Sequence, residues 1–163
     1  YDGEHRRDRA AALVETMNIP TLRHEKGRWR QRMQLKFIFE NLLETGNAVT
    51  AGGDRPSTVW NGDSGYARKS LGQVRQLAET FLQPLPVERI QVPGGPNQTE
   101  SHILCTTVMG GDPGDSIVDA GLVHHKARNL LVLGGSVFPT ASPANPTLTL
   151  CALSLMAADR FLS

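Results

Sequence analysis

Two polar residues stand at the edges of apolar segments, where a side chain could act on a bound molecule. His102 precedes the apolar stretch 103–109, and a neutral imidazole is a suitable general base near neutral pH. Asn145 opens the last apolar stretch of the chain, and its amide could orient a polar group of a substrate. Each residue also has a purely structural interpretation, His102 as a histidine satisfied within the fold and Asn145 as the N-cap of a helix.

The other clusters of titratable residues match no metal-binding pattern. His124 and His125 are adjacent, and neighbours in an extended chain point to opposite faces, so they cannot hold one ion together. Asp112, Asp115 and Asp119 lack the glycine position and the terminal glutamate of a calcium-binding EF-hand loop,. We therefore interpret these aspartates as turn residues and expect no metal site.

Composition excludes several classes of protein. The 163 residues carry 17 Lys and Arg against 16 Asp and Glu, a net charge of +1, so there is no general field for nucleic acid. Residues 1–36 hold nine basic and five acidic residues, which could contact an acidic partner, although a solvated face is the simpler interpretation. Cys105 and Cys151 form no CxxC pattern, so neither a disulfide framework nor a zinc site is indicated.

Hydrophobic spacing predicts the elements that would position these residues. Helices are expected over 4–17 and 66–82, and a third begins at Asn145 with Pro146 at its first position,. The region 33–50 predicts a short strand or helix, a turn and a strand, and the further extended segments are 48–50, 58–60, 87–92, 102–109 and 130–133,. The last helix is apolar nearly all round and should be enclosed by other structure.

These elements predict a single α+β domain over residues 1–163. A mixed or antiparallel sheet is flanked by helices, and the C-terminal helix is buried. Gly134, Gly135 and Ser136 follow the predicted strand 130–133, where bare backbone could approach a phosphate or a sugar chain closely, or simply form a turn. No apolar run approaches the ~20 residues of a membrane span, and no secretory leader is expected in this chain.

Three stretches occur in a fixed order toward the C-terminus: HILCTTVMGGDPGDSIVD, NLLVLGGSVFPT and SPANPTLTLCALSLMAADRFL. Together, over 101–162, they resemble the tail of the glucose-methanol-choline (GMC) family of FAD-dependent oxidoreductases, which reads approximately H-x-x-G-T-x-x-M-G, V-V-D, N-L-x-V-x-D-[AG]-S-x-x-P-T and N-P-x-x-T. The ANPTLT motif is most similar to the sequences of the branch of dehydrogenases that pass electrons to a cytochrome. Two positions depart from the pattern, Cys105 in place of glycine and Gly134 in place of an acidic residue.

The resemblance implies an oxidation of a CH–OH group in a polyol, a sugar acid or an alcohol, with hydride transfer to N5 of FAD. It implies that His102 takes the hydroxyl proton and that Asn145 holds the same oxygen. The helix that starts near Asn145 could also place its positive end at the flavin. The residues implied to contact FAD are Gly134, Gly135, Ser136, Asn145, Pro146 and Thr147.

The resemblance also implies partners. The family carries a Gly-rich FAD-binding unit in an N-terminal portion, which this sequence does not contain,. A cytochrome could accept the electrons, in a periplasmic or membrane-associated complex, with the cytoplasm as the alternative. An exposed terminal helix would favour a homodimer. The competing function is a non-catalytic binding or assembly module that keeps the family tail without bound FAD.

Overall fold

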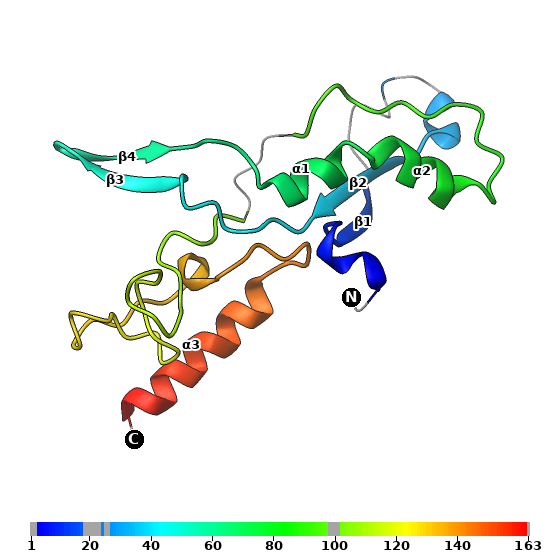
Figure 1. Ribbon diagram of the computed structural model, residues 1–163. Coiled ribbons are helices and arrows are strands. Elements are labelled where there is room, and N and C mark those ends of the chain that lie inside the picture. Colours follow the sequence, from blue (N-terminus) through cyan, green and yellow to red (C-terminus); the bar gives the residue numbers. More distant parts are fainter. Residues whose placement is uncertain (1–2, 18–23, 25–26, 98–101, 163) are drawn as a thin grey trace.

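The computed structural model describes residues 3–17, 24, 27–97 and 102–162. In this part of the chain there are two small antiparallel sheets and three α-helices (Figure 1). The α+β class predicted from the sequence is therefore confirmed. None of the described helices combines the length and the apolar character that a membrane crossing requires.

The first sheet contains β1 (Ala12–Met17) and β2 (Gln34–Phe39), paired antiparallel. The predicted helix over 4–17 is wrong, because only a short 3-10 helix, Glu4–Arg7, precedes the strand β1. Pairing across the sheet explains the difference: Leu13 lies opposite Ile38, and Val14 lies opposite Phe37. Such apolar cross-strand pairs stabilise an extended segment whose own spacing is compatible with a helix.

The second sheet is a hairpin of β3 (Ala48–Gly52) and β4 (Arg55–Val59). Gly53 has φ +62° and stands first in the two-residue turn, where a type II′ turn requires a positive φ. The strand predicted at 48–50 is confirmed, whereas the strand predicted at 58–60 agrees only in part, because β4 begins at Arg55 and ends at Val59. Every residue of both strands is exposed, and the hairpin stands away from the rest of the chain (Figure 1).

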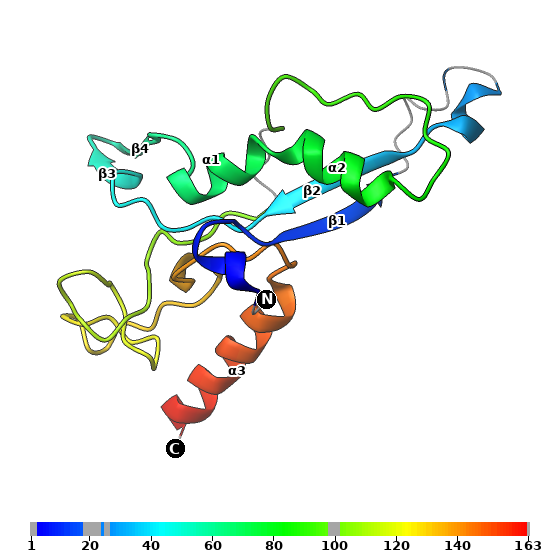
Figure 2. The same ribbon diagram turned by 45° about the vertical axis from the view of Figure 1, so that its right-hand side comes forward.

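The predicted helix 66–82 forms as two helices, α1 (Gly65–Leu71) and α2 (Val74–Leu82). The interruption falls at Gly72, whose missing side chain makes it a poor helix former. Ser64 caps α1, its hydroxyl accepting the N–H of Ala67. Figure 2 shows α1 and α2 running along the β1–β2 sheet, where Ala67 and Ala78 are buried.

Residues 102–146 are mostly irregular and build the main apolar core together with the last helix, α3 (Thr147–Leu162). Its fully buried members are Val118, Leu122, Val137 and Ala157. Three segments predicted to be extended form no strand. The segment 87–92 has no ladder partner, 102–109 makes only an isolated bridge from Met109 to Val118, and 130–133 makes only one from Leu131 to Val123.

The C-terminal helix forms where it was expected, but the prediction that it is enclosed is wrong for this chain. Ala157 is 1% exposed, whereas Leu148, Leu155 and Leu162 are 83%, 72% and 84% exposed. Within the part of the chain that the structure describes, α3 packs through one side only. The exposed surface is 12,324 Å², against about 7,900 Å² for a compact monomer of this mass, so these residues leave a large surface uncovered.

Asn41 connects the part of the chain that contains the β1–β2 sheet and α1 with the segment that precedes α3. Its N–H donates to the carbonyl of Ala141 (2.8 Å), and the N–H of Ala141 donates back (3.0 Å). The side-chain amide of Asn41 also donates to Asp63 (3.0 Å) and accepts the N–H of Ser64 (3.1 Å). One residue thus joins the end of β2, the start of α1 and the approach to α3.

Candidate functional site

The segment that follows His102 and the turn at residues 134–136, called the glycine turn below, lie side by side. The N–H of Cys105 donates to the carbonyl of Gly135 (3.3 Å), and the N–H of Thr107 donates to the carbonyl of Ser136 (2.8 Å). The N–H of Met109 continues this pattern to Val137 (2.9 Å). The stretch that follows His102 is therefore held against the glycine turn by main-chain hydrogen bonds.

Gly135 is the point where these two segments meet the first turn of α3. A Cβ at this position would lie 2.8 Å from Cδ2 of Leu104, 3.0 Å from the carbonyl oxygen of Ile103 and 3.8 Å from Cδ1 of Leu150. A side chain at this position would require the Leu104 side chain and the Ile103 carbonyl to shift. The missing side chain of Gly135 therefore allows the segment 103–104 to pack closely against the glycine turn.

Gly134 differs from its neighbour. Its φ is +107°, and no atom lies within 4 Å of where a Cβ would stand. The conformation is one that L side chains rarely adopt, and the backbone here faces open space. Ser136 is half-buried, and its carbonyl is already engaged with Thr107. Gly134 is also half-buried and its carbonyl accepts the N–H of Val137 (3.4 Å), but the space where its side chain would stand is open to a bound group.

The start of α3 lies one residue later than expected. Its first main-chain bond runs from the N–H of Leu150 to the carbonyl of Pro146 (2.9 Å), so Pro146 occupies the cap position and Thr147 is the first helical residue. The expectation that Asn145 caps the helix is wrong. The N–H groups of the first turn have no carbonyl one turn earlier, and this end of the 16-residue helix carries the positive end of its dipole.

His102 and Asn145 stand just outside this meeting point. His102 precedes the Ile103–Leu104 contact with Gly135, and Asn145 precedes the cap of α3. Both residues are exposed, and among the described residues neither side chain has a hydrogen-bond partner. Neither purely structural interpretation therefore accounts for them: the imidazole is not satisfied within this fold, and the amide is not a cap.

Cys105 has the left-handed conformation, with φ +70°. This is the position where the family pattern has glycine, and glycine adopts such a φ without a steric cost. The thiol is half-buried, and burial raises its pKa, which favours the protonated form. Cys105 and Cys151 are both free thiols.

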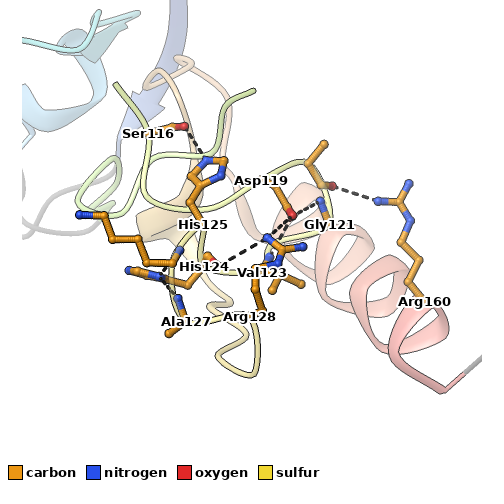
Figure 3. A network of polar contacts seen from close by, with 11 residues as sticks. Ser116, Asp119, Gly121, Val123, His124, His125, Ala127, Arg128 and Arg160 are labelled. Carbon is orange, nitrogen blue, oxygen red and sulfur yellow. Dashed lines mark hydrogen bonds and ion pairs between the residues drawn. The ribbon is translucent and has the colours of Figure 1, made fainter. Parts of the chain in front are cut away.

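A polar network beside the core holds the loop 112–128 (Figure 3). One carboxylate oxygen of Asp119 accepts the N–H groups of Gly121 (2.8 Å) and Val123 (3.1 Å), and the other accepts Nη1 of Arg128 (2.9 Å). The hydrogen bond from Arg128, followed by that from the Val123 N–H, lowers the pKa of Asp119. The role of this aspartate as a turn residue is confirmed.

The two adjacent histidines also have structural partners. Nδ1 of His124 accepts the N–H groups of Lys126 (3.1 Å) and Ala127 (2.9 Å). Nε2 of His125 lies 2.9 Å from Oγ of Ser116, a buried hydroxyl that donates to the carbonyl of Asp112. Sequence reasoning missed this Ser116–His125 contact, because a separation of nine residues outside any helix or strand carries no periodic signal. Within the described ranges, no three His, Cys, Asp or Glu side chains gather as a metal site.

Comparison with known proteins identifies the family of this chain. Residues 45–154 match the GMC oxidoreductase family in its C-terminal domain, and the chain therefore belongs to the GMC oxidoreductases. Over 100 residues it is 37% identical to the fructose dehydrogenase large subunit of Gluconobacter japonicus. That match covers 60% of this chain and 18% of the relative, so the chain corresponds to a small part of the relative's length.

Proposed function

We propose that this chain is the C-terminal, active-site-bearing part of an FAD-dependent dehydrogenase that oxidises the CH–OH group of a sugar, a sugar acid or an alcohol. The observation that carries the proposal is the meeting of three family segments at Gly135, with His102 and Asn145 exposed at its border. Fructose is the first substrate to test, because the relative is named a fructose dehydrogenase.

The residues present fit a flavin cofactor. Gly134 presents bare backbone to open space, which suits the close approach of a phosphate or ribityl chain. The start of α3 offers free N–H groups and a positive partial charge of about +0.5, which favour an anionic group. Gly134, Gly135, Ser136, Asn145, Pro146 and Thr147 would hold FAD, which when bound would supply an acceptor for two electrons.

His102 and Asn145 have different roles toward the substrate. A nitrogen of the His102 imidazole accepts the proton of the substrate hydroxyl, and the exposed position of this side chain leaves it accessible to a bound alcohol. The Asn145 amide cannot take that proton, but its N–H₂ group can donate a hydrogen bond to the same oxygen. A positioned base of this kind contributes about 10² to 10⁴ in rate.

The partners in this proposal follow from the family resemblance. A separate FAD-binding portion of the protein completes the site, and a cytochrome accepts the electrons. The enzyme works in a periplasmic or membrane-associated complex. Arg7 and Arg9 are exposed at the basic front of the chain, where an acidic acceptor could dock.

The full-length protein that contains this chain provides the test. It should purify with flavin absorbance and should reduce a dye with fructose or another member of a polyol and sugar-acid panel. His102→Ala should retain the flavin and lower the rate of flavin reduction by about 10² to 10⁴, and Asn145→Ala should lower turnover with little change in thermal stability. His5→Ala, another exposed histidine, is the matched control.

Two outcomes would contradict the proposal. A full-length protein without flavin would favour the binding or assembly module, and a His102→Ala variant that reduces its flavin at the wild-type rate would remove the proposed base.

A further inference from the structure

The hairpin β3–β4 is a two-stranded ribbon with two outer edges. In the described part of the chain, β3 pairs with β4 and with no other strand. Every residue of the ribbon is exposed, including Val49 at 53% and Val59 at 43%. An isolated two-stranded ribbon is at best marginally stable in water, so its edges are sites where a further strand would add stability.

The register shows which groups face outward. Gly52 lies opposite Arg55 across a two-residue turn, so this pair exchanges hydrogen bonds, and the hydrogen-bonded pairs then alternate along the ladder,. The pair Ala51–Pro56 is thus a non-hydrogen-bonded pair, as it must be, because proline has no N–H to donate. It follows that the main-chain groups of Val49 and Ala51 point away from β4.

The two outer edges are not equivalent. On β4 the outward groups belong to Pro56 and Thr58, and the proline removes a donor, which is a common way to protect an edge strand. On β3 the sequence Ala-Val-Thr-Ala-Gly has neither proline nor charge. The edge of β3 is therefore open for strand addition, whereas the edge of β4 is partly closed.

We infer that the outer edge of β3 pairs with an extended strand from the part of the same polypeptide that lies outside these 163 residues. The inference rests on the proposed function, in which this chain is one part of a longer enzyme. The matched relative is more than five times as long as the matched segment, which spans 18% of it. The total accessible surface of 12,324 Å² exceeds the roughly 7,900 Å² of a compact monomer of this mass, and an excess of this size favours a large covering body over a short peptide.

Amide hydrogen exchange in the full-length protein tests the pairing. The N–H groups of Val49 and Ala51 should exchange at least about 100-fold more slowly than that of Thr58, because a paired amide exchanges only when the strand opens. Thr58 is the internal control, since its N–H also points outward but lies on the edge that Pro56 protects. Equal exchange at the three amides would overturn the inference.

Two proline variants distinguish the edges. Ala51→Pro removes an outward N–H from β3, and Thr58→Pro removes one from β4, and neither breaks the ladder between the two strands. Ala51→Pro should abolish the slow exchange at Val49 and lower the Tm of the full-length protein, whereas Thr58→Pro should leave the slow exchange intact. Equal effects of the two variants would overturn the proposed edge.

A dilution series identifies the occupant. Slow exchange that is independent of concentration supports a strand of the same polypeptide, and slow exchange lost on dilution would overturn the inference in favour of a second copy. This measurement does not depend on flavin. A full-length protein with a protected β3 edge and no flavin would refute the proposed catalytic function alone, and a flavin enzyme with an unprotected edge would refute only the pairing.

Discussion

Cys105 occupies a conformation that belongs to glycine. A non-glycine residue in the left-handed region costs about 1–2 kcal/mol, and the main chain at Cys105 is held there by its bond to Gly135. The thiol itself is half-buried. The residue therefore combines a strained backbone with a side chain beside the candidate site.

Cys105→Gly should be tolerated and should raise or maintain the Tm of the full-length protein, because the backbone strain disappears. Cys105→Ala is the matched control, since it removes the thiol but keeps a Cβ at φ +70°. Thermal unfolding of both variants separates the two effects. A glycine variant less stable than the alanine variant would contradict the strain argument, and an alanine variant less stable than the wild type would show that the thiol fills a necessary space.

The carboxylate of Asp119 should contribute stability that depends on pH. Its pKa is lowered in the folded protein, first by Arg128 and then by the Val123 N–H, relative to about 3.9 in an unfolded chain. The contribution is therefore fully present above the unfolded pKa and is lost as the pH falls through the lower, folded pKa.

Unfolding measurements between pH 2 and 7 on the wild type and Asp119→Asn check this. The two proteins should differ in stability above about pH 4 and converge at the acid end. Asp115→Asn, an exposed carboxylate of the same loop, should follow the wild type. A constant difference over the whole range would show that the charge of Asp119 is irrelevant.

At the level of the elements, Asn41 holds β2, α1 and the loop before α3 in one arrangement. Asn41→Ala keeps the main-chain pair with Ala141 but leaves Asp63 and the N–H of Ser64 without their amide partner. Two lost hydrogen bonds predict a destabilisation of about 1–3 kcal/mol, measured by chemical unfolding of the full-length protein. Asn97→Ala, at an exposed asparagine, should be neutral, and equal stability of both variants would contradict the linking role.

For the whole molecule, the uncovered face of α3 and the excess surface agree with a chain that folds against further protein. Leu148, Leu155 and Leu162 recur at intervals of seven residues and are exposed here. A continuous apolar stripe of this kind is costly in water and is normally covered. This agrees with the short share of the relative that the chain matches.

Electron transfer should distinguish the proposed dehydrogenase from an oxidase. The full-length enzyme should reduce a dye or a cytochrome quickly and oxygen slowly. If the basic front of the chain docks an acidic acceptor, salt should slow the cytochrome reaction, because the Debye length falls to ~8 Å at 0.15 M. Replacing Arg6, Arg7 and Arg9 by alanine should weaken this salt dependence and leave dye reduction unchanged.

Peroxide production and dye reduction measured across a salt series check both parts. Rapid, stoichiometric peroxide formation would place the enzyme among the oxidases, and salt-independent transfer to the natural acceptor would remove the docking role of the three arginines.

The sequence alone identified what depends on local pattern. The amphipathic segment 66–82 and the last helix follow from apolar spacing within one segment, whereas the sequence predicted strands at 48–50 and 58–60 but not the hairpin turn at Gly53. The order of the family segments likewise pointed to the GMC oxidoreductases before any contact was known. These features need no information about distant residues.

Only the tertiary structure decided what depends on partners far along the chain. Residues 12–17 became β1 because β2 offers apolar partners more than twenty residues away, and an extended segment gains its stability from such a neighbour. The contacts of Gly135 with Ile103 and Leu150 likewise cannot be predicted from the spacing of apolar residues within one segment. The exposure of α3 has the same cause, since an apolar pattern predicts that a face is covered but not which part of a protein covers it.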